Sequence, residues 1–94
     1  MLLENKVFII TGASSGIGEE LSKQLSKEGA KIVCAARTED KLKAVSEEIN
    51  TSGGDSIYVQ TDINNLKQCQ NLIDRTVESF GKIDGLVLNA GISM

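Results

Sequence analysis

Short apolar runs alternate with helix-spaced segments along the whole chain, and this alternation limits the possible folds most strongly. Four mostly apolar stretches, at 7–10, 32–36, 57–59 and 85–88, have the length and continuity of strands buried on both faces. In the segments between them, apolar residues recur every three or four positions, as on one face of a helix. Strands joined by helices in this way form a parallel sheet covered on both sides. The sequence therefore predicts an α/β fold with the order βαβαβαβ.

The apolar spacing also predicts which side chains the helices bury. The predicted inner faces are Ile17, Leu21 and Leu25 in the first helix, Leu42, Val45 and Ile49 in the second, and Leu66, Cys69, Ile73, Val77 and Phe80 in the third. Thr38 is the predicted N-cap of the second helix, and Asn64 or Asn65 that of the third. Right-handed crossovers then favour a doubly wound, Rossmann-type sheet of strand order 3-2-1-4, formed as one domain by residues 1–94.

Composition narrows the classes of partner. The chain has 94 residues and a net charge of −3, which argues against a nucleic-acid backbone as a partner. It has no histidine, and therefore no histidine base and no histidine metal ligand; no metal site is predicted. Cys34 and Cys69 are expected to be buried free thiols in a reducing compartment. No stretch approaches the roughly 18 apolar residues of a membrane-spanning helix, so we expect a soluble, cytoplasmic protein.

Three glycines lie between the first strand and the first helix, in the spacing G-x-x-x-G-x-G. Gly12 would let the chain turn sharply out of the strand, and Gly16 would leave the helix N-terminus open to a ligand. Gly18 would let the helix pack closely on the sheet. The free N–H groups and the dipole at such a helix end favour an anion, for example a pyrophosphate. A turn that needs glycines only for packing is the alternative.

The same loop also matches a different chemistry. Residues 12–16 read G-A-S-S-G, the G-x-S-x-G nucleophile elbow of serine hydrolases, with Ser14 as the nucleophile. That elbow needs a histidine base, which this chain does not contain. Neither Gly18 nor Arg37 has a role in such an elbow. The hydrolase alternative stays open at this point, whereas a P-loop is excluded because no Lys-Ser/Thr follows the loop.

Three motifs in order resemble the short-chain dehydrogenase/reductase family. They are "TGASSGIG" at 11–18, "TDI" at 61–63, and "LNAG" at 88–91, where Leu88 replaces the first Asn of the family's N-N-A-G. The stretch "GASSGIGEELSKQLSKEGA" is similar to the hydroxysteroid-dehydrogenase-like branch. The resemblance implies a dinucleotide cofactor held by the glycine loop. The implied cofactor-binding residues of the loop are Gly12, Ser14, Ser15, Gly16, Ile17 and Gly18.

The other two motifs carry implied roles as well. Asp62 would accept a hydrogen bond from the adenine amino group, and the backbone N–H of Ile63 would donate to the ring. Asn89, Ala90 and Gly91 would lie against the adenine ribose, while Thr11 would connect the glycine loop to this last turn. Alternatively, Asp62 only starts a turn, and residues 89–91 form a plain strand exit.

Arg37 indicates which dinucleotide is bound. NAD-binding domains usually carry an acidic residue at the end of the second strand, where this chain has Ala36 followed by Arg37. A guanidinium can hold a ribose 2′-phosphate through two hydrogen bonds, so the sequence predicts NADP(H). Arg37 could instead be an exposed residue that starts a helix. Glu39 and Asp40 could be read as ribose acceptors, but they fit better as acids in the first turn of a helix.

No catalytic residue can be assigned. The family uses a Ser, a Tyr and a Lys in Y-x-x-x-K spacing, all downstream of the N-A-G turn, whereas the one tyrosine here, Tyr58, is followed four residues on by Asp62. We therefore expect the cofactor-binding portion of an NADP(H)-dependent oxidoreductase that transfers a hydride between nicotinamide and an alcohol or carbonyl. The portion would end after the fourth strand and lack turnover. A stand-alone nucleotide-binding module is the alternative. An unpaired fourth-strand edge and bare faces would favour a homo-oligomer.

Overall fold

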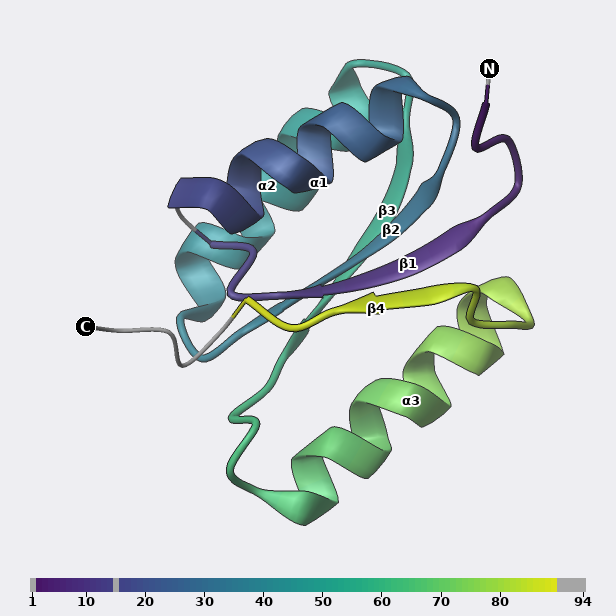
Figure 1. Ribbon diagram of the computed structural model, residues 1–94. Helices are drawn as coiled ribbons and strands as arrows, with labels where there is room; N and C mark the ends of the chain where they lie inside the picture. Colours follow the sequence, from purple (N-terminus) through teal and green to yellow (C-terminus); the bar gives the residue numbers. More distant parts are fainter. Residues whose placement is uncertain (1, 15, 90–94) are drawn as a thin grey trace.

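A computed structural model describes residues 2–14 and 16–89 (Figure 1). Its elements are β1 (Val7–Thr11), α1 (Gly16–Lys27), β2 (Lys31–Ala36), α2 (Glu39–Thr51), β3 (Asp55–Gln60), α3 (Leu66–Phe80) and β4 (Gly85–Val87). The predicted α/β class and the order βαβαβαβ are confirmed. Within the two described ranges, no helix has the length and apolar character needed to cross a membrane.

The four strands form one parallel sheet in the order β3-β2-β1-β4, which confirms the predicted 3-2-1-4 arrangement. β4 lies at the edge of this sheet and pairs with β1 at three positions, Phe8 to Gly85 through Ile10 to Val87. Gly85 lets β4 approach the Phe8 ring at the first of them, because a Cβ there would lie 2.6 Å from Cδ1 and the ring would have to move. The observed strand ends at Val87, one residue before the end of the predicted strand 85–88.

Helices cover the two faces of the sheet unequally. α1 and α2 lie on one face and α3 on the other (Figure 1). Consecutive residues of β1 supply the two cores: Ile10 belongs to the cluster on the α1–α2 side, and Ile9 to the cluster that contains Leu72 of α3. The predicted inner face of α2 is confirmed, since Leu42, Val45 and Ile49 are buried. One side of the molecule is thus built around two helices and the other around one.

The predicted inner faces of α1 and α3 are partly wrong. Leu21 and Leu25 pack against the core, but Ile17 is 76% exposed. α1 instead buries Gly18 and Ser22, because close packing on the sheet requires small residues there. In α3 the buried residues are Leu72 and Thr76, and the side chains predicted to be buried turn to solvent or are only partly covered. The relative exposures are 85% for Leu66, 37% for Ile73 and 45% for Val77, while Cys69 and Phe80 are intermediate.

Helix ends follow the predicted caps with one difference. Asn65 is the N-cap of α3, and its side chain accepts from the backbone N–H of Gln68. Thr38 occupies the N-cap position of α2, but its side chain makes no capping hydrogen bond. α3 ends at Gly81, which has a left-handed φ of 79°, as expected of a glycine just past a helix.

An apolar surface remains exposed next to β4. Leu86 pairs with Ile9 and therefore faces the α3 side of the sheet, where it is 50% exposed. Leu88 is 65% exposed, and Val77 lies on the helix that covers this face. Self-association through these side chains stays a prediction, to be tested by sedimentation of the protein over a range of concentrations.

The two cysteines differ in burial. Both are free thiols; Cys34 is buried in the core, as predicted, whereas Cys69 is only partly covered. Burial raises the pKa of the Cys34 thiol to about 12, so this group remains protonated at neutral pH. A protonated, enclosed thiol is a packing group rather than a nucleophile.

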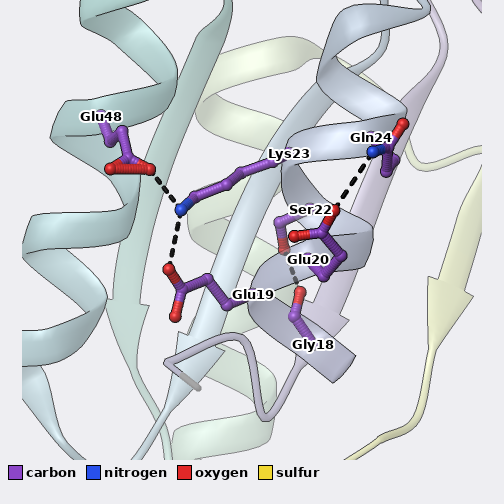
Figure 2. A network of polar contacts seen from close by, with 7 residues as sticks. All are labelled: Gly18, Glu19, Glu20, Ser22, Lys23, Gln24 and Glu48. Carbon is purple, nitrogen blue, oxygen red and sulfur yellow. Dashed lines mark hydrogen bonds and ion pairs between the residues drawn. The ribbon is translucent and has the colours of Figure 1, made fainter. Parts of the chain in front are cut away.

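An ion-pair network joins α1 to α2 (Figure 2). The ammonium of Lys23 lies 2.7 Å from a carboxylate oxygen of Glu19, one helical turn earlier, and also pairs with Glu48 of α2. Hydrogen bonds to these two carboxylates raise the pKa of Lys23. The network links α1 to α2, the helix that follows Arg37.

Asp84 anchors the start of β4. Its carboxylate accepts a hydrogen bond from the backbone N–H of Val7 at 2.8 Å and pairs with the ammonium of Lys82 at 3.2 Å. The hydrogen bond from Val7 is the main reason that the pKa of Asp84 lies below its ordinary value of 3.8. Because the pKa is lower in the folded state, the carboxylate stabilises the fold at pH values above 3.8, and this contribution is lost as the pH falls through the lower, folded-state pKa.

We therefore expect Asp84→Asn to lower the free energy of unfolding at neutral pH. The difference from the unmodified protein should shrink as the pH falls below 3.8, because the wild-type carboxyl then also becomes protonated. Urea unfolding over this range measures both effects. Asp74→Asn, on the exposed side of α3, is the control. A loss of stability in Asp84→Asn that is the same at every pH would contradict this assignment.

Candidate functional site

A pocket lies at the carboxyl ends of β1, β2 and β3, where open parallel sheets bind ligands. Its volume is about 420 Å³. It is lined by Thr11, Gly12, Ser14, Ala35, Ala36, Arg37, Thr38, Thr61, Asp62, Ile63 and Asn64. Among these described residues, Arg37 and Asp62 are the charged ones. The pocket therefore places one cation and one carboxylate at the ends of neighbouring strands.

The glycine loop forms one wall of this pocket. Gly12 and Gly16 both adopt left-handed backbone conformations, with φ of 67° and 59°. A Cβ at Gly16 would meet no described heavy atom within 4 Å, so the space in front of the first turn of α1 is open. The N-terminal N–H groups of α1 consequently border an open volume that suits an anionic group.

Gly18 has no room for a side chain. A Cβ there would lie 2.7 Å from the carbonyl carbon of Gly12 and 2.9 Å from Nδ2 of Asn89. The first of these neighbours is backbone, which cannot rotate away. α1 therefore approaches the end of β1 as closely as the sequence pattern predicts, and it does so because residue 18 is glycine.

Thr11 connects the glycine loop to the exit of β4, as the family resemblance implies. Its buried hydroxyl donates to the backbone oxygen of Val87 at 3.1 Å and accepts from the backbone N–H of Asn89 at 2.9 Å. The side chain of Asn89 in turn donates to the backbone oxygen of Gly12 at 3.5 Å. The loop after β1 and the turn after β4 are thus parts of one hydrogen-bonded unit.

Arg37 is exposed at the end of β2, where it borders the pocket. Its backbone oxygen accepts a hydrogen bond from the side-chain amide of Gln60 at 3.0 Å, which fixes the main chain while leaving the guanidinium at the surface. Arg37 also lines an adjoining cavity of about 350 Å³, together with Gln60, Asp62 and Gln68. Glu39 and Asp40 occupy the first turn of α2, as the sequence favours, and neither lines the main pocket.

Asp62 and Ile63 follow β3 directly. The backbone N–H of Thr61 donates to the backbone oxygen of Ala36 at 2.8 Å, so pairing with the neighbouring chain continues up to the site. One carboxylate oxygen of Asp62 accepts from the backbone N–H of Asn64 at 2.9 Å. Asp62 does start the turn before α3, and its carboxylate borders the pocket at the same time.

The structure brings together most of the predicted site. Gly12, Ser14, Arg37, Asp62 and Ile63 line the pocket. Residues beside it are Gly16, Ile17 and Gly18 at the start of α1, and Asn89, which reaches the loop through Gly12. Ser15, Ala90 and Gly91 lie outside the described residues.

Sequence reasoning missed Gln60 and Gln68. The side chain of Gln60 holds the main chain at Arg37, and that of Gln68 holds the main chain at Asp62. For Gln68 a signal existed: a glutamine three residues after an Asn N-cap is the spacing at which a side chain reaches back to the start of its helix. For Gln60 no local signal existed, since its partner is 23 positions away in the chain.

Another cavity, of about 410 Å³, lies between α1 and the end of α2. Lys23, Lys27, Glu48 and Gly54 are among the residues that line it. The ammonium of Lys23 is engaged by Glu19 and Glu48, and none of the predicted site residues borders this cavity. The chemistry expected from the sequence therefore concentrates in the pocket at the carboxyl ends of the strands.

Comparison with known proteins agrees with this geometry. The model of the short chain dehydrogenase family matches residues 6–94. An uncharacterized oxidoreductase of Listeria innocua is 45% identical over 92 residues, which is 98% of this chain and 37% of the relative. An 11-beta-hydroxysteroid dehydrogenase-like protein of Arabidopsis thaliana is 46% identical over 88 residues, covering 93% of this chain and 29% of that protein.

Solved structures give the same result. A hydroxysteroid dehydrogenase from Escherichia coli superimposes with a TM-score of 0.92 at 36% identity, over 95% of this chain and 38% of that one. A short chain dehydrogenase/reductase from Burkholderia phymatum in complex with NAD gives 0.88 at 35% identity, with coverages of 92% and 31%. A metagenomic short-chain oxidoreductase in complex with NADP gives 0.91 at 34% identity, with coverages of 98% and 42%.

This chain thus spans well under half the length of the relatives it matches, 37% in the case of the Listeria protein. The match of the family model extends over nearly all of its residues. It includes the glycine loop, the turn after β3 and the exit of β4. The chain belongs to the short-chain dehydrogenase/reductase family and corresponds to its N-terminal, cofactor-binding part.

Proposed function

We propose that this part of the chain, residues 1–94 as one domain, binds NADP(H) in preference to NAD(H). The observation that carries the proposal is the position of Arg37, exposed at the end of β2 on the rim of the pocket, with no acidic residue among the pocket-lining residues of that strand end. A guanidinium there favours a ribose 2′-phosphate, whereas a carboxylate would favour the unmodified 2′-hydroxyl. The two complexed relatives differ in cofactor, one holding NAD and the other NADP.

The rest of the pocket fits the other groups of a dinucleotide. The open space before Gly16 at the N-terminus of α1 suits the pyrophosphate, with Ser14 beside it. Asp62 and Ile63 offer a carboxylate and a backbone N–H to an adenine ring. We assign Ser15 and Ile17 to the same loop contacts, and Asn89, Ala90 and Gly91 to the ribose side.

The whole protein is proposed to transfer a hydride between the bound nicotinamide and an alcohol or carbonyl substrate. These 94 residues are proposed to bind the cofactor without turnover, as a nucleotide-binding module would. Tyr58 supports this, because it lies in β3 against the core rather than at the pocket. Family membership and the geometry of Gly18 favour cofactor binding over the hydrolase alternative with Ser14 as nucleophile.

Reversal of the charge at residue 37 tests the proposal. Arg37→Asp should weaken NADP binding by about 10- to 150-fold, the worth of a hydrogen bond to a charged group, and should strengthen NAD binding relative to NADP. Calorimetric titration of each dinucleotide measures both affinities. The matched control is Arg75→Asp, an exposed arginine of α3 that does not line the pocket.

The control should leave the ratio of the two affinities unchanged. Tighter binding of NAD than of NADP by the unmodified protein would overturn the proposed cofactor preference. If the unmodified protein bound neither dinucleotide, the proposed function as a whole would be overturned.

A further inference from the structure

The turn between β3 and α3 is held in place by the first turn of α3. The backbone N–H of Asp62 donates to Oε1 of Gln68 at 2.8 Å. The backbone oxygen of Asp62 accepts from the N–H of Asn65 at 2.9 Å. The backbone of Gln68 is held in turn, because its N–H donates to the side chain of the N-cap Asn65 at 3.1 Å. The arrangement is like a capping box in which the glutamine reaches past the cap to Asp62, three residues before it.

These bonds leave a defined set of groups available in the pocket. The N–H of Asp62 is occupied by Gln68, and one of its carboxylate oxygens is occupied by Asn64. Within the described part of the chain, the other carboxylate oxygen has no hydrogen-bond partner. The backbone oxygen of Ile63 accepts from the thiol of Cys69 at 3.4 Å, again from the first turn of α3. What remains for a ligand is one carboxylate oxygen of Asp62 and the N–H of Ile63.

Such a pair recognises one kind of purine edge. A carboxylate oxygen attracts an amino group and repels a carbonyl oxygen, so its position decides between adenine and a base that carries oxygen at the same ring carbon. The discrimination depends on how firmly the carboxylate is held, because a mobile side chain can turn away from the repulsive contact. In this fold the side chain that holds the backbone N–H of Asp62 is that of Gln68.

We propose that Gln68 is a positioning residue that sets the selectivity of this site for adenine over hypoxanthine dinucleotides. The inference rests on the proposed function, since it concerns the base of the same bound cofactor. Gln68 acts through Asp62, because the side-chain amide oxygen of Gln68 accepts the hydrogen bond from the backbone N–H of Asp62.

The experiment compares NADPH with its hypoxanthine counterpart, in which oxygen replaces the adenine amino group. Three variants are titrated with both ligands: Gln68→Leu, which removes the acceptor, Gln68→Glu, which keeps one, and Gln70→Leu. Gln70 is the matched control, because it lies in the same helix and bonds to Asp74 rather than to the site. The ratio of the two affinities is the readout, since a general loss of stability affects both ligands alike. Amide hydrogen exchange at Asp62 without ligand gives a second, independent readout.

We expect the unmodified protein to prefer NADPH by roughly tenfold or more, the worth of one hydrogen bond to a carboxylate. In Gln68→Leu the ratio should fall about fivefold, the effect of one ordinary hydrogen bond, and the Asp62 amide should exchange faster. Gln68→Glu and Gln70→Leu should retain both the ratio and the slow exchange.

An unchanged ratio in Gln68→Leu, or a ratio that Gln68→Glu fails to retain, would overturn the inference while leaving the proposed function intact. If Gln68→Leu does not fold, the inference is tested by the affinity ratio of Gln68→Glu and by the exchange of the Asp62 amide in the unmodified protein. Rapid exchange there would overturn the inference. Failure of the unmodified protein to bind NADPH would instead overturn the proposed function.

Discussion

Gly18→Ala is expected to destabilise the protein by about 2 kcal/mol, the usual cost of adding a methyl group to a packed site. We also expect it to weaken NADP binding by more than about tenfold. The added Cβ would lie 2.7 Å from the carbonyl carbon of Gly12 and 2.9 Å from Nδ2 of Asn89. Alanine normally stabilises a helix by about 1 kcal/mol relative to glycine. The free-energy cost of the clash is therefore larger than the measured loss of stability. α1 would have to move away from the end of β1, and its N-terminus would move with it.

The measurements are urea unfolding and calorimetric titration with NADP. Gln24→Ala, an exposed position of the same helix, is the control and should change stability by less than about 0.5 kcal/mol. A Gly18→Ala protein with unchanged stability and unchanged affinity would show that the close approach of α1 to Gly12 has no role in the site.

Thr11→Val should cost about 2 to 4 kcal/mol of folding free energy, because two polar backbone groups lose their partner at once. The buried hydroxyl bonds the backbone oxygen of Val87 and the N–H of Asn89. Valine has nearly the same shape but no hydroxyl, so the loss reports hydrogen bonding rather than volume. Because β4 pairs with β1 at only three positions, the strand depends on this contact more than a longer strand would.

Urea unfolding measures the total, and amide exchange at Asn89 shows where the loss occurs. Thr11→Ser keeps the oxygen and should retain most of the stability and the protection of Asn89. A Thr11→Val protein as stable as the unmodified one, with Asn89 still protected from exchange, would show that the hydroxyl bridge does not hold the exit of β4.

The fold could be predicted from the sequence to a large extent, and the reasons are local. The runs at 7–10 and 32–36 are apolar at consecutive positions because both faces of the sheet are covered, and this pattern indicates a central parallel strand. The glycine at the end of α3 and the asparagine at its start act within their own turn. The buried face of α3 could not be predicted, because the helix carries an apolar stripe wider than the part that reaches the sheet. Leu72 and Thr76 are buried while Ile73 and Val77 lie at its edge.

In the candidate site, too, features that depend on sequence neighbours could be predicted, and contacts between distant segments could not. The place of the glycine loop before α1 and of Arg37 after β2 could be predicted, because both follow from neighbours in the sequence. The bond between Gln60 and the backbone at Arg37 joins two strands, and that between Thr11 and Asn89 spans 78 positions; the latter was expected only through the family resemblance. Contacts of this kind depend on strand order and register, which a local pattern does not contain.

Binding of 2′,5′-ADP and of 5′-AMP to the unmodified protein isolates the contact with the 2′-phosphate, because the two ligands differ only in that group. We expect 2′,5′-ADP to bind at least about tenfold more tightly, through Arg37 on the rim of the pocket. This advantage should shrink as salt is added, since the contact is between exposed charges. Equal affinity for the two ligands, or tighter binding of 5′-AMP, would contradict an NADP(H) site at this end of the sheet.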